Sequence, residues 1–369
     1  MGRPAQRLGV VGNDVPRPVV LAHGAVPVRL SGAWSGPVSA RAAALLGAVD
    51  AAAARLLDGL LEGPKDGRLE GLAGLVVCHD SAAHLRLFYV LRVLADRGDL
   101  PVPVHLLDAP RCDDPVTGRP DPEGPRVRFV ERSYHRLAEF CAGLTGRRPT
   151  SHDLAEAWRS DEQVGTALAR LRDRRAGQHV TGTAALGAYR AAATLPPTDA
   201  LAAIAGEVGD DDAVPIVVTG SNHPDASVYA EIERHGACVV AEDHDTGDAT
   251  WIDAADEGGC DGDGDLDALI GALARRHARR PPAASRSRSS VRAEHLLATV
   301  RRTGARGVLC LARAHDDAPA WDAPVQDAAL RRVGIPFVAR TRIGDDPLAV
   351  AAAATDELVA AATAREAGR

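Results

Sequence analysis

Four short polar segments carry the side chains of this chain that are best suited to chemistry. Each follows a short apolar run: His79-Asp80-Ser81, Thr219-Gly220-Ser221-Asn222-His223, Glu242-Asp243-His244-Asp245 and His315-Asp316-Asp317. Three of the four place a histidine beside an aspartate. Imidazole and carboxylate groups transfer protons as general acids and bases, and they also ligate metal ions that prefer nitrogen and oxygen.

These segments predict a site with three kinds of residue. The residues expected to be catalytic are His79, Asp80, His315 and Asp316. A non-sulfur metal, if one is used, would take its ligands from His79, Asp245, His315 and Asp316. Substrate binding is expected from Ser81, Thr219, Gly220, Ser221 and Asn222, with the backbone N–H groups of 219–221 facing a carbonyl or phosphate oxygen. The structural alternative is that Asp80 and Ser81 only cap a helix.

Alternating strands and helices must position these segments. Buried parallel strands are predicted at Leu72–Cys78, Val102–Leu107, Pro215–Thr219, Ala237–Ala241, Gly307–Leu311 and Ile335–Ala339. Helices are predicted at Ala40–Leu61, Ser81–Arg97, Val130–Leu144, Ser151–Arg174, Ala226–His235, Ser290–Thr303 and Ala349–Arg365. The pattern predicts an α/β protein with two Rossmann-like lobes, parallel sheets and a ligand cleft between the lobes.

The division along the chain follows from where the strands occur. We expect an N-terminal α/β lobe over residues 1–130, a helical connecting region over 131–212 and a C-terminal α/β lobe over 213–369. Asp253–Asp267 reads as a solvated loop and Arg279–Ser290 as a poorly ordered linker. The arginines around this linker would suit the phosphates of a nucleotide-like ligand, or they form an ordinary solvated face.

Composition limits the partners and the location. The 369 residues carry 43 basic and 50 acidic side chains, a net charge of −7, which disfavours nucleic acid as a partner. The sequence predicts no membrane span and no signal peptide, so a cytoplasmic location is expected. Six cysteines occur without any CxxC pair, and in a reducing compartment they are expected to be buried thiols.

The order of these segments resembles the D-component family of 2-hydroxyacyl-CoA dehydratases, which also contains benzoyl-CoA reductase subunits. The matching residues include Gly74-Leu75-Val76-Val77 with Asp80-Ser81, Pro215–Ser221, Thr246-Gly247 and Trp321-Asp322-Ala323-Pro324. The resemblance implies a two-lobed protein that pairs with a related subunit. It also implies a 4Fe–4S cluster held by cysteines between the lobes and an ATP-dependent activator that supplies an electron.

The chain departs from this family where the cluster cysteines would fall. Their positions carry His79, with Cys78 one residue early, Asp245 and Asp316. Iron–sulfur clusters need thiolate ligands, whereas His and Asp suit harder metal ions. We therefore predict that an ordinary 4Fe–4S cluster is absent and that a non-sulfur metal could replace it.

Three functions fit this combination. The first is a cluster-free dehydratase-like enzyme, a lyase, acting on an acyl thioester or related carboxylic substrate in the cleft. The second is a non-catalytic partner of a cluster-bearing relative, so that either a homodimer or a heterodimer is expected. The third is a biosynthetic enzyme that does not use CoA and works through a His/Asp metal or acid–base site.

Overall fold

The chain folds around two separate parallel sheets. The computed structural model describes residues 6–62, 69, 71–114, 117–204, 212–252 and 265–367. The first sheet has the strand order β2-β1-β3-β4 and the second has the order β6-β5-β7-β8. All strand pairings within them are parallel, which confirms the predicted α/β class with two lobes. The strands are β1 (Gln6–Val11), β2 (Ala25–Leu30), β3 (Leu72–Cys78), β4 (Val104–Leu107), β5 (Val214–Gly220), β6 (Ala237–Glu242), β7 (Gly307–Arg313) and β8 (Phe337–Ile343).

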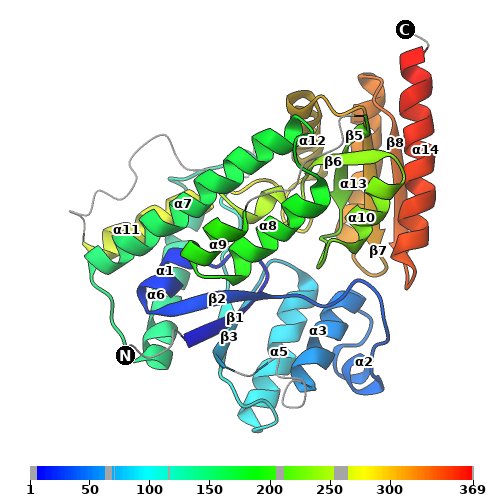
Figure 1. Ribbon diagram of the computed structural model, residues 1–369. Helices are drawn as coiled ribbons and strands as arrows, with labels where there is room; N and C mark the ends of the chain where they lie inside the picture. Colours follow the sequence, from blue (N-terminus) through cyan, green and yellow to red (C-terminus); the bar gives the residue numbers. More distant parts are fainter. Residues whose placement is uncertain are drawn as a thin grey trace.

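Helices cover the faces of both sheets (Figure 1). Those before β5 are α1 (Arg17–Ala22), α2 (Ala40–Leu46), α3 (Ala51–Leu61), α5 (Ala82–Asp96), α6 (Pro125–Thr145), α7 (Ser151–Ala176), α8 (Gly182–Thr194) and α9 (Pro197–Ala203). Those after β5 are α10 (Ser227–Arg234), the 3-10 turn η1 (Asp248–Thr250), α11 (Leu266–His277), α12 (Ser289–Thr303), α13 (Asp317–Arg332) and α14 (Pro347–Ala367).

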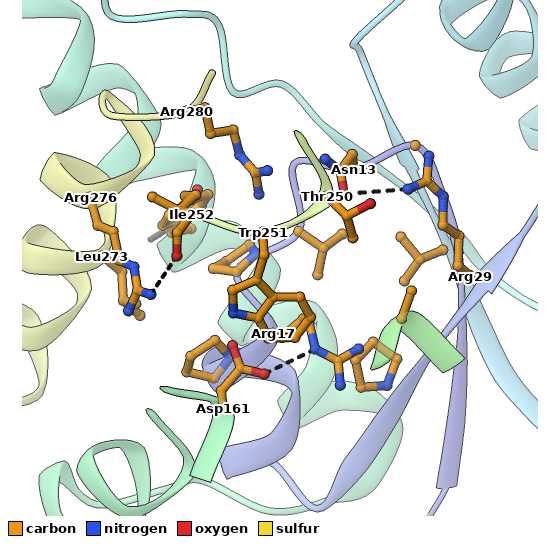
Figure 2. Close-up of a pocket in the computed structure, with 18 residues that line it drawn as sticks. Asn13, Arg17, Arg29, Asp161, Thr250, Trp251, Ile252, Leu273, Arg276 and Arg280 are labelled. Carbon is orange, nitrogen blue, oxygen red and sulfur yellow. Dashed lines mark hydrogen bonds and ion pairs between the residues drawn. The ribbon is translucent and has the colours of Figure 1, made fainter. Parts of the chain in front are cut away.

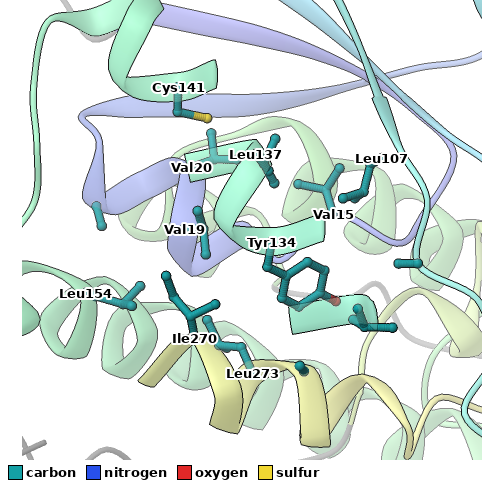
Figure 3. Packing of buried hydrophobic residues seen from close by; sticks show 14 of the residues in the cluster. Val15, Val19, Val20, Leu107, Tyr134, Leu137, Cys141, Leu154, Ile270 and Leu273 are labelled. Carbon is teal, nitrogen blue, oxygen red and sulfur yellow. The ribbon is translucent and has the colours of Figure 1, made fainter. Parts of the chain in front are cut away.

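The first sheet is buried on both faces. Helices α2, α3 and α5 pack on one face, through a cluster that includes Leu57, Leu87 and Leu91. On the other face, Tyr134 and Leu137 of α6 meet α1, α7 and α11 (Figure 3). Helix α11 lies within the range 213–369, yet it packs against α6 on the N-terminal sheet. The chain therefore returns to the first lobe between β6 and β7.

The second sheet is also enclosed. Helices α10 and α14 cover one face, and α12 and α13 cover the other. Trp34, which follows β2 of the first sheet, belongs to the core of the second. Side chains thus cross between the lobes and tie the two sheets together.

Two strands and several helix boundaries differ from the sequence prediction. Neither β1 nor β2 was expected, because β1 begins with two polar residues and Pro27 and Arg29 interrupt the apolar pattern of β2. The single helix expected over Ala40–Leu61 is two helices. Gly47, at φ +67°, ends α2, and the Asp50 carboxylate caps α3 by accepting the Ala52 N–H at 3.1 Å.

One helix among the described residues is long and apolar enough to cross a membrane by length and composition. It is Pro347–Arg365 within α14, in contrast to the sequence prediction of no membrane span. Ala351, Ala354 and Leu358 of this helix are fully buried in the core of the second lobe. A single such helix is weak evidence for a membrane span, and the cytoplasmic location stays a prediction.

Candidate functional site

The strand ends of the two sheets enclose one polar pocket, which we call the inter-lobe pocket. Its empty volume is about 1180 Å³, counting the part open to solvent. The first lobe contributes Asn13, Arg29, Asp50, Asp80 and His84, and the second contributes Asn222, His244, Asp245, Arg313 and Asp316. Ligands of open parallel sheets bind beyond the carboxyl ends of the strands, which is where these residues lie.

A histidine–aspartate pair lies at the end of β3. The Asp80 carboxylate contacts His84 Nδ1 and accepts the Asn13 N–H at 3.0 Å. Gly12 permits this arrangement, since a Cβ at its φ of +93° would overlap the Asp80 carboxylate. Burial lowers the pKa of His84, but Asp80 and Asp245 outweigh it, so the net pKa is raised. A raised pKa favours the protonated imidazolium, and Nδ1 is the ring nitrogen that contacts Asp80.

Asp316 provides a carboxylate from the opposite lobe. Its Oδ2 accepts the Ser221 hydroxyl at 2.5 Å, and the Ser221 oxygen in turn accepts the Arg313 N–H at 3.0 Å. Burial, together with Asp50 and Asp245, raises the pKa of Asp316 against the attraction of Arg313. A raised pKa makes a carboxylate a stronger base. The charge of Asp245 raises the pKa of both Asp316 and His84, and all three side chains line the pocket.

Two arginine–aspartate pairs join the lobes at the pocket wall. Arg29 binds Asp245, with Nη2 2.8 Å from Oδ2, while Arg313 binds both carboxylate oxygens of Asp50 at 3.0 and 2.8 Å. Burial raises the pKa of Asp245, but Arg29 and Asn222 lower it more. Both pairs are largely buried, so they fix the distance between the sheets and thereby the distance between His84 and Asp316.

The β6 loop that carries Asp245 is anchored by Glu242. This buried carboxylate binds Arg175, with Nη1 2.9 Å from Oε1, and accepts the Tyr229 hydroxyl at 3.1 Å. The same hydroxyl lies 2.8 Å from Nε2 of His244, which lines the pocket. Burial raises the pKa of Glu242, yet Arg175 lowers it to about 2. The loop is therefore built around a permanent buried charge.

The segment Arg279–Ser290 has defined contacts in place of the poorly ordered linker that the sequence predicts. Arg286 contacts the Asp14 carboxylate and donates to the Ala109 and His79 carbonyls. Arg111 donates to the Arg280 carbonyl at 2.7 Å. The segment covers one side of the pocket. Arg286 thus directs its charge at protein acceptors, while phosphate binding by the other arginines around this segment stays a prediction. Residues 253–264 of the predicted solvated loop lie outside the described residues.

The two histidines predicted to be catalytic lie outside the pocket lining. His79 Nδ1 is 3.2 Å from Asp108, and its side chain is 38% exposed. His315 is exposed and has a φ of +64°. Asp80 and Asp316, by contrast, both line the pocket. The structure thus separates each predicted histidine from the aspartate beside it in sequence.

The predicted binding residues have mixed positions. Ser81, Gly220 and Asn222 line the pocket, but the Ser81 hydroxyl also caps α5 by accepting the His84 N–H at 3.1 Å. The Thr219 hydroxyl donates to Asp243 at 2.9 Å. The Ser221 N–H donates to the Leu311 carbonyl at 2.8 Å and so is committed to the sheet. The Ser221 hydroxyl reaches the pocket only through Asp316.

The described residues contain no group of three His, Cys, Asp or Glu side chains arranged to hold a metal ion. Of the four predicted ligands, Asp245 and Asp316 line the pocket, where Asp245 binds Arg29 and Asp316 accepts the Ser221 hydroxyl. His79 and His315 are not among the residues that line it. The convergence that a His/Asp metal site requires is therefore not seen in the part of the chain that the structure covers.

One family model matches most of the chain. The model described as "2-hydroxyglutaryl-CoA dehydratase, D-component" matches residues 13–340. The chain belongs to this dehydratase D-component family. No curated protein matches it in sequence. The match covers β2 to β7 and part of β8, and it includes every residue of the inter-lobe pocket named above except Gly12; β1 lies before it.

The donors present do not fit the iron–sulfur cluster that the family resemblance implies. No cysteine lies among the residues that line the inter-lobe pocket. Cys78 and Cys310 are buried within β3 and β7, and Cys112, which adjoins the lining residue Arg111, is also buried. Burial raises the pKa of Cys310 to about 12 and also raises that of Cys78. Cluster ligation needs thiolates, which this environment disfavours; Cys260 lies outside the described residues.

Sequence reasoning missed His84, Arg29 and Arg313. The spacing of Asp80 and His84, four residues apart across a helix start, is a signal that could have found the first, because such residues share a helix face. The two arginines carried no local signal, since their partners are more than two hundred residues away in the chain.

Proposed function

We propose that this member of the dehydratase D-component family is a cluster-free acid–base enzyme acting on an acyl thioester or related carboxylic substrate. One observation carries the proposal: His84 and Asp316, two proton-transferring groups from opposite lobes, line the same pocket. Asp80 orients His84 through its Nδ1, and Ser221 orients Asp316 through its Oδ2. In the proposal the other ring nitrogen and the other carboxylate oxygen act on the substrate. Acid and base groups with separate environments are typical of lyase sites.

In this proposal Asp316 is the base and His84 is the acid. The Asp316 carboxylate removes a proton from the carbon next to the thioester carbonyl, where the carbonyl acidifies the C–H bond. His84 Nε2 gives its proton to a hydroxyl on the following carbon, and the C–O bond breaks as the C=C bond forms. Water leaves, and the two protons and the bonding electrons are balanced.

Such an ionic route places the departing hydroxyl on carbon 3 of the acyl group. A hydroxyl on carbon 2 would require a proton from carbon 3, which the carbonyl does not acidify. The Arg29–Asp245 and Arg313–Asp50 pairs join the two lobes beside the pocket, which supports a fixed relative position of the proposed acid and base. In this proposal the carbonyl oxygen is bound by Asn222 and Arg29, which both line the pocket and contact Asp245.

Hydration of trans-2-hexenoyl-CoA, in aerobic buffer without activator or reductant, tests the proposal. Loss of the enoyl absorbance is followed for the wild type and for His84→Gln and Asp316→Asn, with unfolding temperatures as a check on the fold. Each variant should lower kcat about 100-fold or more, the usual contribution of a general acid or base. His79→Ala and His315→Ala are the matched controls and should keep full turnover. Loss of turnover in the controls alone would contradict the assignment.

A non-catalytic partner role is the second candidate. It is favoured by the description of the matched family as a component of a dehydratase and by the absence of cysteine from the pocket lining. Co-expression with a neighbouring paralogue followed by size-exclusion chromatography separates the two functions. A stable homodimer that is active alone would exclude the partner role.

A further inference from the structure

A second pocket adjoins the inter-lobe pocket and shares only part of its lining. We call it the tryptophan pocket, and Figure 2 shows Trp251 at its centre, between Arg17 and Arg280. Its empty volume is about 710 Å³, counting the part open to solvent, which lies within the usual range for small-molecule sites. Its apolar lining includes Val10, Pro16, Pro18, Pro27, Tyr134 and Leu273.

The two pockets share a common wall. Gly12, Asn13, Arg29 and Arg280 line both. Asn13 is fixed across the lobes, since its Nδ2 donates to the Ala249 carbonyl at 2.9 Å. A molecule that places its reacting carbons near His84 and Asp316 therefore has the tryptophan pocket as the adjoining space for the rest of its chain.

The charged residues of the tryptophan pocket are already neutralised by protein groups. Arg17 donates to Asp161 at 3.0 Å and stacks over the Trp251 ring, with Cζ 5.3 Å from the centroid. Arg276 donates to Glu162 and to the Ile252 carbonyl, each at 2.9 Å. Arg29 pairs with Asp245 at 2.8 Å, and Arg280 Nε lies 3.6 Å from Asp14, although Arg280 Nη1 is buried without a hydrogen-bond partner. Each arginine of the lining therefore already faces a protein carboxylate, and a carboxylate at the far end of a ligand would have to compete with it at a cost in desolvation.

We propose that the tryptophan pocket is a specificity subsite that receives an apolar or aromatic acyl tail and rejects a tail that ends in a carboxylate. This inference rests on the proposed function and names its substrate class. Trp251 supplies a rigid apolar surface, because Gly165 lacks the Cβ that would overlap its indole edge. The substrate class is therefore a mono-carboxylic acyl thioester with an apolar tail.

Calorimetric binding of two matched thioesters tests this assignment. Hexanoyl-CoA and hexanedioyl-CoA have the same chain length and differ only in a terminal methyl or carboxylate. The wild type should bind hexanoyl-CoA at least about 10-fold more tightly, since one group in an apolar pocket gives 10–200-fold discrimination. Ile252→Lys and Ala193→Lys, which add a cation from two different elements, should shrink or invert that ratio. Leu348→Lys, an exposed position on α14, is the control and should keep it.

A second probe distinguishes a failure of the tail assignment from a failure of the proposed function. Hexan-1-ol is added to the wild type and to Trp251→Phe, and the tryptophan fluorescence of the two proteins is compared. The difference between them reports binding in the tryptophan pocket without any thioester. If both thioesters bind equally, or if hexanedioyl-CoA binds more tightly, the tail assignment is overturned and the proposed function stands. If neither thioester binds but hexan-1-ol changes the Trp251 signal, the apolar subsite stands and the proposed function falls. No response to any probe overturns both.

Discussion

Replacing Glu242 with glutamine should destabilise the chain strongly. The side chains of Glu242 and Arg175 are almost fully buried, with exposed fractions of 0% and 1%. Loss of the carboxylate charge leaves the Arg175 guanidinium buried, with Asp248 at 3.6 Å as its remaining acidic partner. Breaking one half of a buried ion pair costs about 3 to 5 kcal/mol. The pKa of Glu242, about 2 against an ordinary value of 4.5, corresponds to a similar contribution to the free energy of unfolding, about 3 kcal/mol.

The pH dependence of this effect has a defined sign. Because the folded state lowers the pKa of Glu242, its contribution to stability is fully present above about pH 4.5 and is lost as the pH falls toward 2. The stability difference between the wild type and Glu242→Gln should therefore be largest near neutral pH and shrink in acid.

Urea unfolding followed by tryptophan fluorescence measures the free energy of unfolding for both proteins. The double variant Arg175→Met/Glu242→Gln should lose less stability than Glu242→Gln alone, because no unpaired charge stays buried. Glu139→Gln removes a carboxylate from an exposed pair with Arg148 and should leave the unfolding midpoint unchanged. A midpoint for Glu242→Gln equal to that of Glu139→Gln would refute the reasoning.

Three further predictions concern the pocket wall. Gly12→Ala should cost about 1 to 3 kcal/mol in thermal unfolding, because a Cβ at φ +93° is strained and would displace Asp80; an unchanged unfolding temperature would contradict this. Asp50→Ala leaves Arg313 largely buried without its two-oxygen partner and should cost about 2 kcal/mol or more by urea unfolding, whereas Asp345→Ala, on an 83%-exposed aspartate, should have no measurable effect. Since the folded state raises the pKa of His84, the stability advantage of the wild type over His84→Gln should be full below about pH 6.5 and decline as the pH rises; a growing advantage would contradict the pairing with Asp80.

The sequence predicts the strands best where they are uniformly apolar. β5 and β7 are buried along their whole length, so their residues show the continuous pattern of an enclosed parallel strand. β2 breaks this pattern with Pro27 and Arg29, and it was missed for that reason. Arg29 is in the strand because its partner, Asp245, approaches from the other lobe.

The site was also predictable only in part, because it too depends on contacts between the two lobes. Asp80 and Asp316 follow apolar strands directly, so their position at a sheet edge could be predicted. Which of the adjacent histidines faces the pocket depends on the turn after each strand. His315 adopts a φ of +64° and is exposed, while His84 enters the pocket from the first turn of α5. That His84 and Asp316 line the same pocket depends on how the two sheets face each other, which no local pattern encodes.

The most direct test of the acid–base claim is proton exchange at the carbon next to a thioester carbonyl. Hexanoyl-CoA is incubated in D₂O with protein purified in air and without reductant, and deuterium incorporation is measured by mass spectrometry. The wild type should exchange the protons on carbon 2, Asp316→Asn should reduce the rate about 100-fold or more, and His315→Ala should match the wild type. Absence of exchange by the wild type, or an equal rate in Asp316→Asn, would contradict the account.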